Sequence, residues 1–207
     1  MKVLLINGSP HKDGCTFTAL SEIVGELEKQ GIETQIFQIG KQPIRGCVAC
    51  GQCEDTGYCS YKSDIVNECI GLMRAADGII VGSPVYYASP NGALLALLDR
   101  AFFASGDAFA YKPAAAIVSC RRGGSATAFD VLNKYFTISN MPVVSSQYWN
   151  HVHGQTPEDV RQDLEGLQVM RVLGRNMAWL LKCIEAAKGK VPYPEKEPER
   201  MWTNFVR

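Results

Sequence analysis

Four of the eight cysteines lie in one short segment, at Cys47, Cys50, Cys53 and Cys59. The intervals between them are two, two and five residues. The segment is rich in glycine and turn-forming residues, so its backbone can wrap around an inorganic core. Because four thiolates suit a [4Fe-4S] cluster, this spacing indicates metal or redox chemistry.

Two other states of these cysteines stay open. A structural zinc site normally pairs two short hairpins across a longer gap, whereas reduced thiols without a metal fit the spacing as well as a cluster does. The run also differs from the bacterial ferredoxin motif, which has three residues before its last cysteine and a proline after it. Here five residues precede Cys59 and Ser60 follows it.

Residues 8–18 form a second segment that could do chemistry, a loop between an apolar run and an amphipathic helix. Exposed N–H groups and the positive end of a helix favour an anion there. The loop also carries hydroxyls and positive charge, at Ser9, His11, Lys12, Thr16 and Thr18. It has neither the G-x-G-x-x-G fingerprint nor the Walker motif, so a monophosphate fits best. The same residues also suit an ordinary turn and helix cap.

Two further loops follow predicted strands, at residues 83–90 and 120–125. In a doubly wound sheet the ligand crevice lies outside the carboxyl ends of the strands. The three loops therefore converge on one pocket. Tyr86 and Tyr87 can wall a flat ring, and backbone N–H groups of the Gly123-Gly124 pair can reach its polar edge.

Alternating strands and helices must position these loops. Apolar runs predict strands at residues 2–7, 33–39, 78–82, 114–119 and 141–144. Apolar residues at three-and-four spacing predict helices after each strand, the last one continuous from 156 to about 188. This pattern predicts an α/β fold with a five-stranded parallel sheet, order 2-1-3-4-5, doubly wound by helices on both faces.

Length and composition bound the classes of function. The 207 residues suit one domain, 46% of them are hydrophobic and 20% are charged, which excludes a disordered or coiled-coil chain. Lys plus Arg and Asp plus Glu both count 21, so no excess charge favours nucleic acid or membrane. Because neither a signal peptide nor a spanning segment is present, we expect a cytoplasmic protein with small-molecule partners.

The chain divides into a domain at residues 1–190, with a cysteine-rich insertion at 45–62, and a tail at residues 191–207. Prolines prevent the tail from continuing the last helix. It ends with the apolar side chains Met201, Trp202, Phe205 and Val206. We therefore expect the tail to dock on its own domain or on a second copy, in a homodimer or homotetramer.

The pair His151-x-His153 has no third ligand near it in sequence, so it is interpreted as a loop feature and not as a metal site. Neither a G-x-S-x-G elbow nor an H-E-x-x-H motif occurs, which removes the commonest hydrolase interpretations.

Three motifs carry a resemblance to a known family. Gly8-Ser9-Pro10 with Thr16, the run from Gly82 to Tyr86, and Leu98-Asp99-Arg100 resemble the NADPH-dependent FMN reductases, over residues 1–150. The resemblance implies a flavodoxin-like fold, bound FMN and NAD(P)H as cosubstrate. The cysteine run is similar to that of the iron-sulfur flavoproteins, a branch of this family that holds a [4Fe-4S] cluster on such cysteines.

The resemblance also implies roles for particular residues. The FMN phosphate would lie at Ser9, His11, Cys15, Thr16, Phe17 and Thr18. The flavin ring would lie on Pro84, Val85, Tyr86 and Tyr87, with Arg121, Arg122, Gly123 and Gly124 near its pyrimidine end. Residues 148–154 would approach the flavin, with His153 lining the substrate cavity. His11 and Cys15 depart from the arginine or lysine and the asparagine usual in the family, so backbone contacts would dominate there.

Two functions follow as hypotheses. The first is an FMN-dependent oxidoreductase of the NAD(P)H:flavin or quinone type, with or without a [4Fe-4S] cluster in its electron path. The flavin performs the chemistry, so no side chain is expected to act as a general acid or base. The second is a flavodoxin-type carrier or redox-sensing module that exchanges electrons with a partner of ferredoxin type and does not turn over NAD(P)H.

Overall fold

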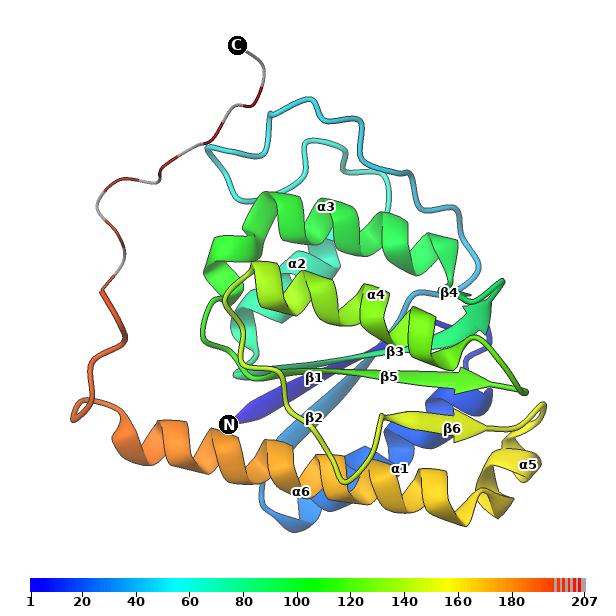
Figure 1. The fold of residues 1–207 in the computed structure, drawn as a ribbon. Coiled ribbons are helices and arrows are strands. Elements are labelled where there is room, and N and C mark those ends of the chain that lie inside the picture. The colour runs from blue at the N-terminus through cyan, green and yellow to red at the C-terminus, as the bar shows by residue number, and fades with distance from the viewer. Residues whose placement is uncertain (196, 198, 200, 202, 204, 206–207) are drawn as a thin grey trace.

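A parallel β-sheet with helices on both faces makes up most of this computed structural model, which describes residues 1–195 and residues 197, 199, 201, 203 and 205 (Figure 1). The strands are β1 (Lys2–Asn7), β2 (Glu33–Gln38), β3 (Gly78–Tyr86), β4 (Ser89–Pro90), β5 (Ala114–Cys120) and β6 (His151–His153). The helices are α1 (Cys15–Lys29), α2 (Val66–Ala75), α3 (Gly92–Phe109), α4 (Ser125–Ile138), α5 (Pro157–Gln162) and α6 (Leu164–Ala187).

The strand order is β2-β1-β3-β5-β6, and each of these neighbouring pairs is parallel. The short β4 lies off this path and pairs antiparallel with the end of β3. With β4 set aside, the order is the predicted 2-1-3-4-5. The predicted doubly wound α/β fold is confirmed.

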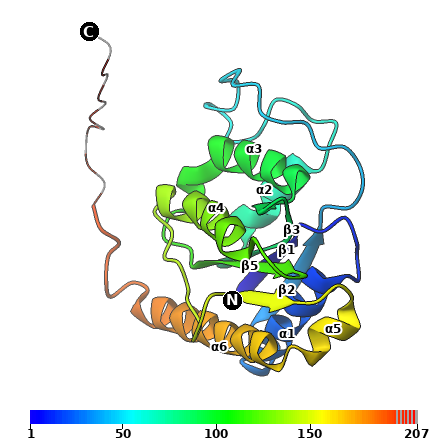
Figure 2. The same cartoon turned by 45° about the vertical axis from the view of Figure 1, so that its right-hand side comes forward.

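β1, β3 and β5 pack into two cores because successive side chains point to opposite faces. In β1, Leu4 and Ile6 lie in the core beneath α2, α3 and α4, whereas Val3 and Leu5 lie in the core against α1 and α6. Figure 2 shows the two helix layers on either side of the sheet. Because β1 is buried on both faces, its apolar run has no polar alternation.

The fifth strand of the sheet is β6, and the predicted strand at residues 141–144 is wrong. That segment makes one isolated bridge, between Ala114 and Val143. Pro142 has no N–H, so the ladder cannot extend from this bridge back toward Lys112. Further along the same edge, the Asn150 side chain donates to the Ala116 carbonyl at 3.0 Å, and β6 then pairs with β5. The pair His151-x-His153, expected in a loop, therefore lies in a strand.

The predicted continuous helix from 156 to 188 is divided at Asp163 into α5 and α6. Asp163 has non-helical backbone angles, with φ −77° and ψ 77°. Its carboxylate accepts hydrogen bonds from the N–H groups of Gly166 (2.9 Å) and His153 (2.7 Å), so it caps α6 and ties that helix to β6. None of the helices in the described residues is long and apolar enough to cross a membrane.

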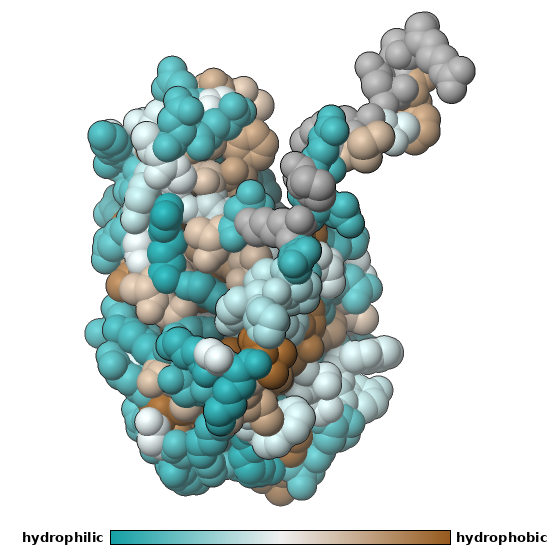
Figure 3. Space-filling view, turned by 90° about the vertical axis from the view of Figure 1, so that its left-hand side faces the viewer, coloured by the Kyte–Doolittle hydropathy of each residue, from teal (hydrophilic) through white to brown (hydrophobic). Residues whose placement is uncertain are grey.

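The tail begins after α6 (Figure 1), on the side of the molecule that faces the viewer in Figure 3. Tyr193 stacks on Tyr111 of the domain, with ring centroids 4.8 Å apart. Met201 and Phe205 are 85% and 91% exposed. The predicted docking contacts of Trp202 and Val206 lie outside the described residues, so tail docking stays a prediction.

Glu26 joins α1 to α6. Its carboxylate accepts from Lys29 at 2.8 Å and from Arg175 of α6 at 3.1 Å. The bond from Lys29, assisted by Arg175 and opposed by burial, holds the pKa of Glu26 below its usual value of about 4.5. A lowered carboxyl pKa stabilises the fold above the unfolded pKa, and this stabilisation is lost as the pH falls through the folded pKa.

We therefore expect Glu26→Gln to lower the free energy of unfolding by about 1 kcal/mol at pH 7. The difference from the wild type should shrink as the pH falls below about 4.5. Urea denaturation at pH 7 and at pH 4 measures both values. An equal difference at the two pH values would mean that Glu26 acts through packing and not through its charge.

Candidate functional site

The carboxyl ends of β1, β3 and β5 open into one cavity of about 760 Å³, here called the strand-end cavity. Its walls come from the loops after β1, β2, β5 and β6 and from the end of β3. The lining residues are Ser9, Pro10, His11, Lys12, Asp13, Gly14, Cys15, Thr16, Lys41, Pro84, Val85, Tyr86, Ser119, Cys120, Arg121, Gly154, Gln155, Thr156 and Pro157. The loops therefore meet at the switch point between β1 and β3, where the sequence predicts a pocket.

A buried amide at the end of β1 holds the first loop. The Asn7 side chain accepts from the Ser9 N–H at 3.1 Å and donates to Gln38 Oε1 at 2.6 Å. Gln38 in turn donates to the Ser9 carbonyl at 2.6 Å. Sequence reasoning missed both residues, although a polar residue that ends an apolar strand is a usable signal. The pair fixes the conformation of the loop beside the cavity.

The N-terminus of α1 faces the cavity without a side-chain cap, because its N-cap residue is Gly14. Cys15 and Thr16, in the first turn, both line the cavity. First-turn N–H groups and the helix dipole attract an anion. The lining adds positive charge at Lys12, Lys41 and Arg121 against one carboxylate at Asp13. The end of the cavity at α1 is therefore built to hold an anionic group.

Close contact between strand ends shapes the floor beneath this loop. The Gly8 N–H donates to the Gly82 carbonyl at 2.8 Å. A Cβ on Gly8 would lie 2.5 Å from Leu94 Cδ2 and 2.6 Å from that carbonyl oxygen. The Asn91 side chain, which caps α3, donates to the Gly8 carbonyl at 2.8 Å. Only glycine fits position 8, and the contact joins the loop to both β3 and α3.

Part of the predicted cofactor set lines the strand-end cavity: Ser9, His11, Cys15, Thr16, Pro84, Val85, Tyr86 and Arg121. The other predicted residues do not border it: Phe17, Thr18, Tyr87, Arg122, Gly123 and Gly124. Sequence reasoning missed several lining residues, among them Lys41, Gln155 and Thr156. Lys41 lies far in sequence from every segment predicted to bind the cofactor, whereas Gln155 and Thr156 directly follow residues 148–154. His153 also lies outside the lining, beside Gly154, which belongs to it.

The hydroxyls predicted to bind phosphate have different environments. Ser9 Oγ accepts from the His11 N–H at 3.1 Å. Thr16 Oγ1 is 2.8 Å from Ser119 Oγ, a contact between the first loop and the end of β5. Thr18 donates to the Gly14 carbonyl within its own helix, at 3.2 Å. Ser9 and Thr16 are thus placed at the cavity, and Thr18 stabilises the start of α1.

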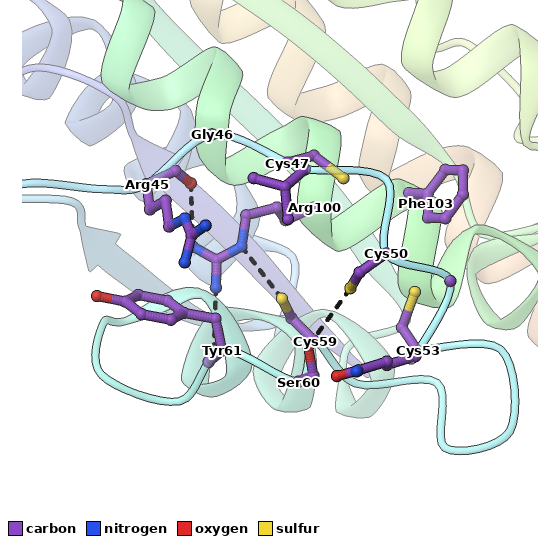
Figure 4. A pocket seen from close by; sticks show the side chains of 13 residues that line it. Arg45, Gly46, Cys47, Cys50, Cys53, Cys59, Ser60, Tyr61, Arg100 and Phe103 are labelled. Atoms are coloured by element: carbon purple, nitrogen blue, oxygen red, sulfur yellow. Dashed lines mark hydrogen bonds between the residues drawn. The ribbon is translucent and has the colours of Figure 1, made fainter.

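The four clustered cysteines border a second cavity of about 280 Å³, here called the cysteine cavity (Figure 4). The loop between β2 and α2 passes over α3 and supplies most of its wall (Figure 1). The lining residues are Arg45, Gly46, Cys47, Val48, Cys50, Gly51, Gln52, Cys53, Cys59, Ser60, Tyr61, Arg100 and Phe103. Left-handed backbone at Ala49 and Gly51 lets the loop turn between the cysteines.

Three of the four sulfur atoms have polar partners. The Ala49 N–H donates to Cys47 Sγ at 3.4 Å, and Cys50 Sγ lies 3.6 Å from Ser60 Oγ. The Arg100 Nε–H donates to Cys59 Sγ at 3.2 Å. Backbone hydrogen bonding at Gln52, followed by the bond to Ser60, lowers the pKa of the Cys50 thiol. Burial raises the pKa of Cys53, which is 8% exposed.

Among the described residues, no three His, Cys, Asp or Glu side chains lie close enough together to hold one metal ion. A multi-iron cluster keeps its thiolates further apart, because each thiolate binds a different iron. The two cavities share no lining residue.

Comparison with known proteins gives consistent matches. The family model of NADPH-dependent FMN reductases matches residues 1–156. An iron-sulfur flavoprotein of Methanocaldococcus jannaschii is 33% identical over 193 residues, covering 89% of this chain and 100% of that protein. An iron-sulfur flavoprotein of Methanosarcina thermophila is 29% identical over 194 residues, covering 92% and 100%.

A similar fold occurs in FerB of Paracoccus denitrificans, a flavoenzyme NAD(P)H:(acceptor) oxidoreductase. Its TM-score is 0.64 at 17% identity, over 88% of this chain and 97% of that chain. At this identity the likeness concerns the fold alone.

Proposed function

The chain belongs to the NADPH-dependent FMN reductase family, in its iron-sulfur flavoprotein branch. From this membership we propose that it takes electrons from NAD(P)H and passes them through FMN and a [4Fe-4S] cluster to a small-molecule acceptor. Membership of this family makes the chain an FMN-dependent oxidoreductase. The observation that supports electron transfer through both FMN and a cluster is the presence of two separate cavities. One is bordered by an uncapped helix N-terminus and the other by four thiols.

The strand-end cavity fits FMN. Its volume of about 760 Å³ lies within the range of ligand pockets, about 300–1,000 Å³. The free first-turn N–H groups of α1 would hold the phosphate, together with the hydroxyl of Ser9. Pro84, Val85 and Tyr86 would contact the flavin ring, because they form the wall at the end of β3. FMN, when bound, supplies both two-electron and one-electron chemistry.

The cysteine cavity fits a cluster. Its four thiols border one space, and the bonds from Ala49 and Arg100 are those that support a thiolate sulfur. Two relatives that align over most of this chain are named iron-sulfur flavoproteins, which favours an iron-sulfur cluster over zinc as the proposed group. We assign Cys47, Cys50, Cys53 and Cys59 as its ligands.

In such a reaction the side chains of this protein would bind and orient the FMN and shield it from water. The Gly8–Gly82 contact and the Asn7 amide fix the loop that would hold the phosphate, and the end of β3 would contact one face of the ring. Arg121, which lines the cavity after β5, would place positive charge near the polar edge of the ring. The reaction needs no general acid or base from the chain, since the cofactor carries the electrons.

Protein purified anaerobically without added cofactor tests the proposal. We expect a flavin absorption spectrum with broad additional absorption and about four irons and four sulfides per chain. We expect Cys50→Ser to lose most of the iron and to keep its flavin, because the cavities share no residue. Cys183→Ser is the matched control, since Cys183 is an exposed thiol on α6 outside both cavities.

Flavin without iron in the wild-type protein would overturn the proposed cluster and leave a simple FMN reductase.

Steady-state oxidation of NADH and NADPH, with free flavin or quinone as acceptor, tests the electron donor. Rapid turnover supports the proposal. A flavin-loaded protein without such turnover would instead be an electron carrier.

A further inference from the structure

Arg100 of α3 lines the cysteine cavity, where its guanidinium lies among Arg45, Cys59 and Tyr61, and the proposed electron path does not account for it (Figure 4). Its side chain is 2% exposed. The Nε–H points at Cys59 Sγ, 3.2 Å away. A buried guanidinium directed at one sulfur atom is an uncommon and costly arrangement, so its contacts indicate a role.

The other nitrogen atoms of Arg100 hold both sides of the cysteine segment. Nη1 donates to the Arg45 carbonyl at 3.1 Å, before the first cysteine, and Nη2 donates to the Tyr61 carbonyl at 3.0 Å, after the last one. Nη1 also pairs with the Asp64 carboxylate, itself only 5% exposed. One planar group therefore fixes the entry and the exit of the loop and one thiol between them.

We propose that Arg100 is a positioning residue for the iron-sulfur cluster, which holds Cys59 in place and raises the reduction potential of the cluster through its Nε–H···Sγ hydrogen bond. This inference rests on the proposed function, since it needs a cluster on the four cysteines. Reduction adds negative charge to the cluster and its sulfur ligands. A hydrogen bond to a ligand sulfur stabilises that charge, and such bonds are among the factors that set cluster potentials.

Two variants distinguish the effect of the Arg100–Cys59 hydrogen bond on the reduction potential from the effect of a nearby positive charge. Arg100→Lys keeps a positive charge beside Asp64 but loses the planar fork that reaches Cys59, Arg45 and Tyr61 at once. Arg45→Gln removes a positive charge from the wall of the same cavity, and no hydrogen bond from the Arg45 side chain to a sulfur is present in the described structure. Because Arg45 is exposed, solvent and salt screen its charge.

The test is a redox titration of anaerobically purified protein, with the reduced cluster followed by electron paramagnetic resonance. We expect Arg100→Lys to weaken cluster reduction by about tenfold, which is about 59 mV for a one-electron couple. We expect Arg45→Gln to shift the reduction equilibrium by less than about twofold. A shift in Arg45→Gln with none in Arg100→Lys would overturn the proposal in favour of charge alone.

A double variant, Asp64→Asn with Arg100→Gln, removes both buried charges together. It is needed because the lysine in Arg100→Lys could still donate a hydrogen bond to Cys59. If both Arg100 variants keep the wild-type potential and iron content, the inference is wrong although the cluster exists. If a variant loses iron while its flavin content and melting temperature stay at wild-type values, the positioning role is supported. Loss of flavin and of thermal stability together would instead mean a general structural role, and would overturn it.

A wild-type protein without iron would remove the cluster itself, and with it this inference. That outcome is distinct from the failure of the inference alone, in which the wild-type cluster is present and insensitive to Arg100.

Discussion

Gly8→Val is expected to purify without FMN and to be destabilised by about 3 kcal/mol or more. The first added carbon would lie 2.5 Å from Leu94 Cδ2 and 2.6 Å from the Gly82 carbonyl oxygen. Leucine can move, but the carbonyl is backbone in the middle of the sheet. The end of β1 must therefore separate from β3, which breaks the Gly8 N–H bond to Gly82 and displaces the loop that would hold the phosphate.

The flavin content of the purified protein and its urea denaturation midpoint measure this effect. Gly25→Ala is the control, because Gly25 lies within α1 and has no atom within 4 Å of an added Cβ. That change should keep the flavin and raise stability by about 0.5–1 kcal/mol. A Gly8→Val protein with full flavin and an unchanged midpoint would refute the close contact between the strand ends.

Asp64→Ala is the second change with a large expected effect. The Asp64 and Arg100 side chains form an ion pair and are 5% and 2% exposed. Removing the carboxylate leaves a buried, unpaired guanidinium, and breaking a buried pair in this way costs about 3–5 kcal/mol. The Asp64 side chain also accepts from the Val66 N–H at 3.3 Å, at the start of α2. The variant should therefore unfold at lower urea concentration and hold the cysteine segment loosely.

Equilibrium urea denaturation at pH 7 measures the loss. Glu185→Ala provides the matched control, because it removes one carboxylate of a surface pair with Lys188 whose side chains are 56% and 75% exposed. Exposed pairs contribute about 0–1 kcal/mol. Equal losses of unfolding free energy in the two variants would mean that the buried Asp64–Arg100 pair stabilises the fold no more than the exposed surface pair does.

Local patterns in the chain predicted the first four strands of the parallel path and the helices that follow them. Continuous apolar runs predict parallel strands buried on both faces, and Leu4 with Ile6 and Val3 with Leu5 do enter opposite cores. Apolar spacing predicts the helices, since one face of each must be buried. The same patterns failed where a single residue interrupts them. Pro142 and the Asn150 amide limit the expected fifth strand to one bridge, and Asp163 divides the last helix by capping its second part.

The amino-acid sequence by itself determined the α/β architecture, the loop with an uncapped helix start and the compact run of four cysteines, because each depends on residues close together in the chain. Only the tertiary structure decided which side chains complete each cavity. Arg100 meets Cys59 across 41 residues of sequence, and Gln38 meets Ser9 across 29. Such contacts depend on how whole elements pack, and no local pattern of residues encodes that packing.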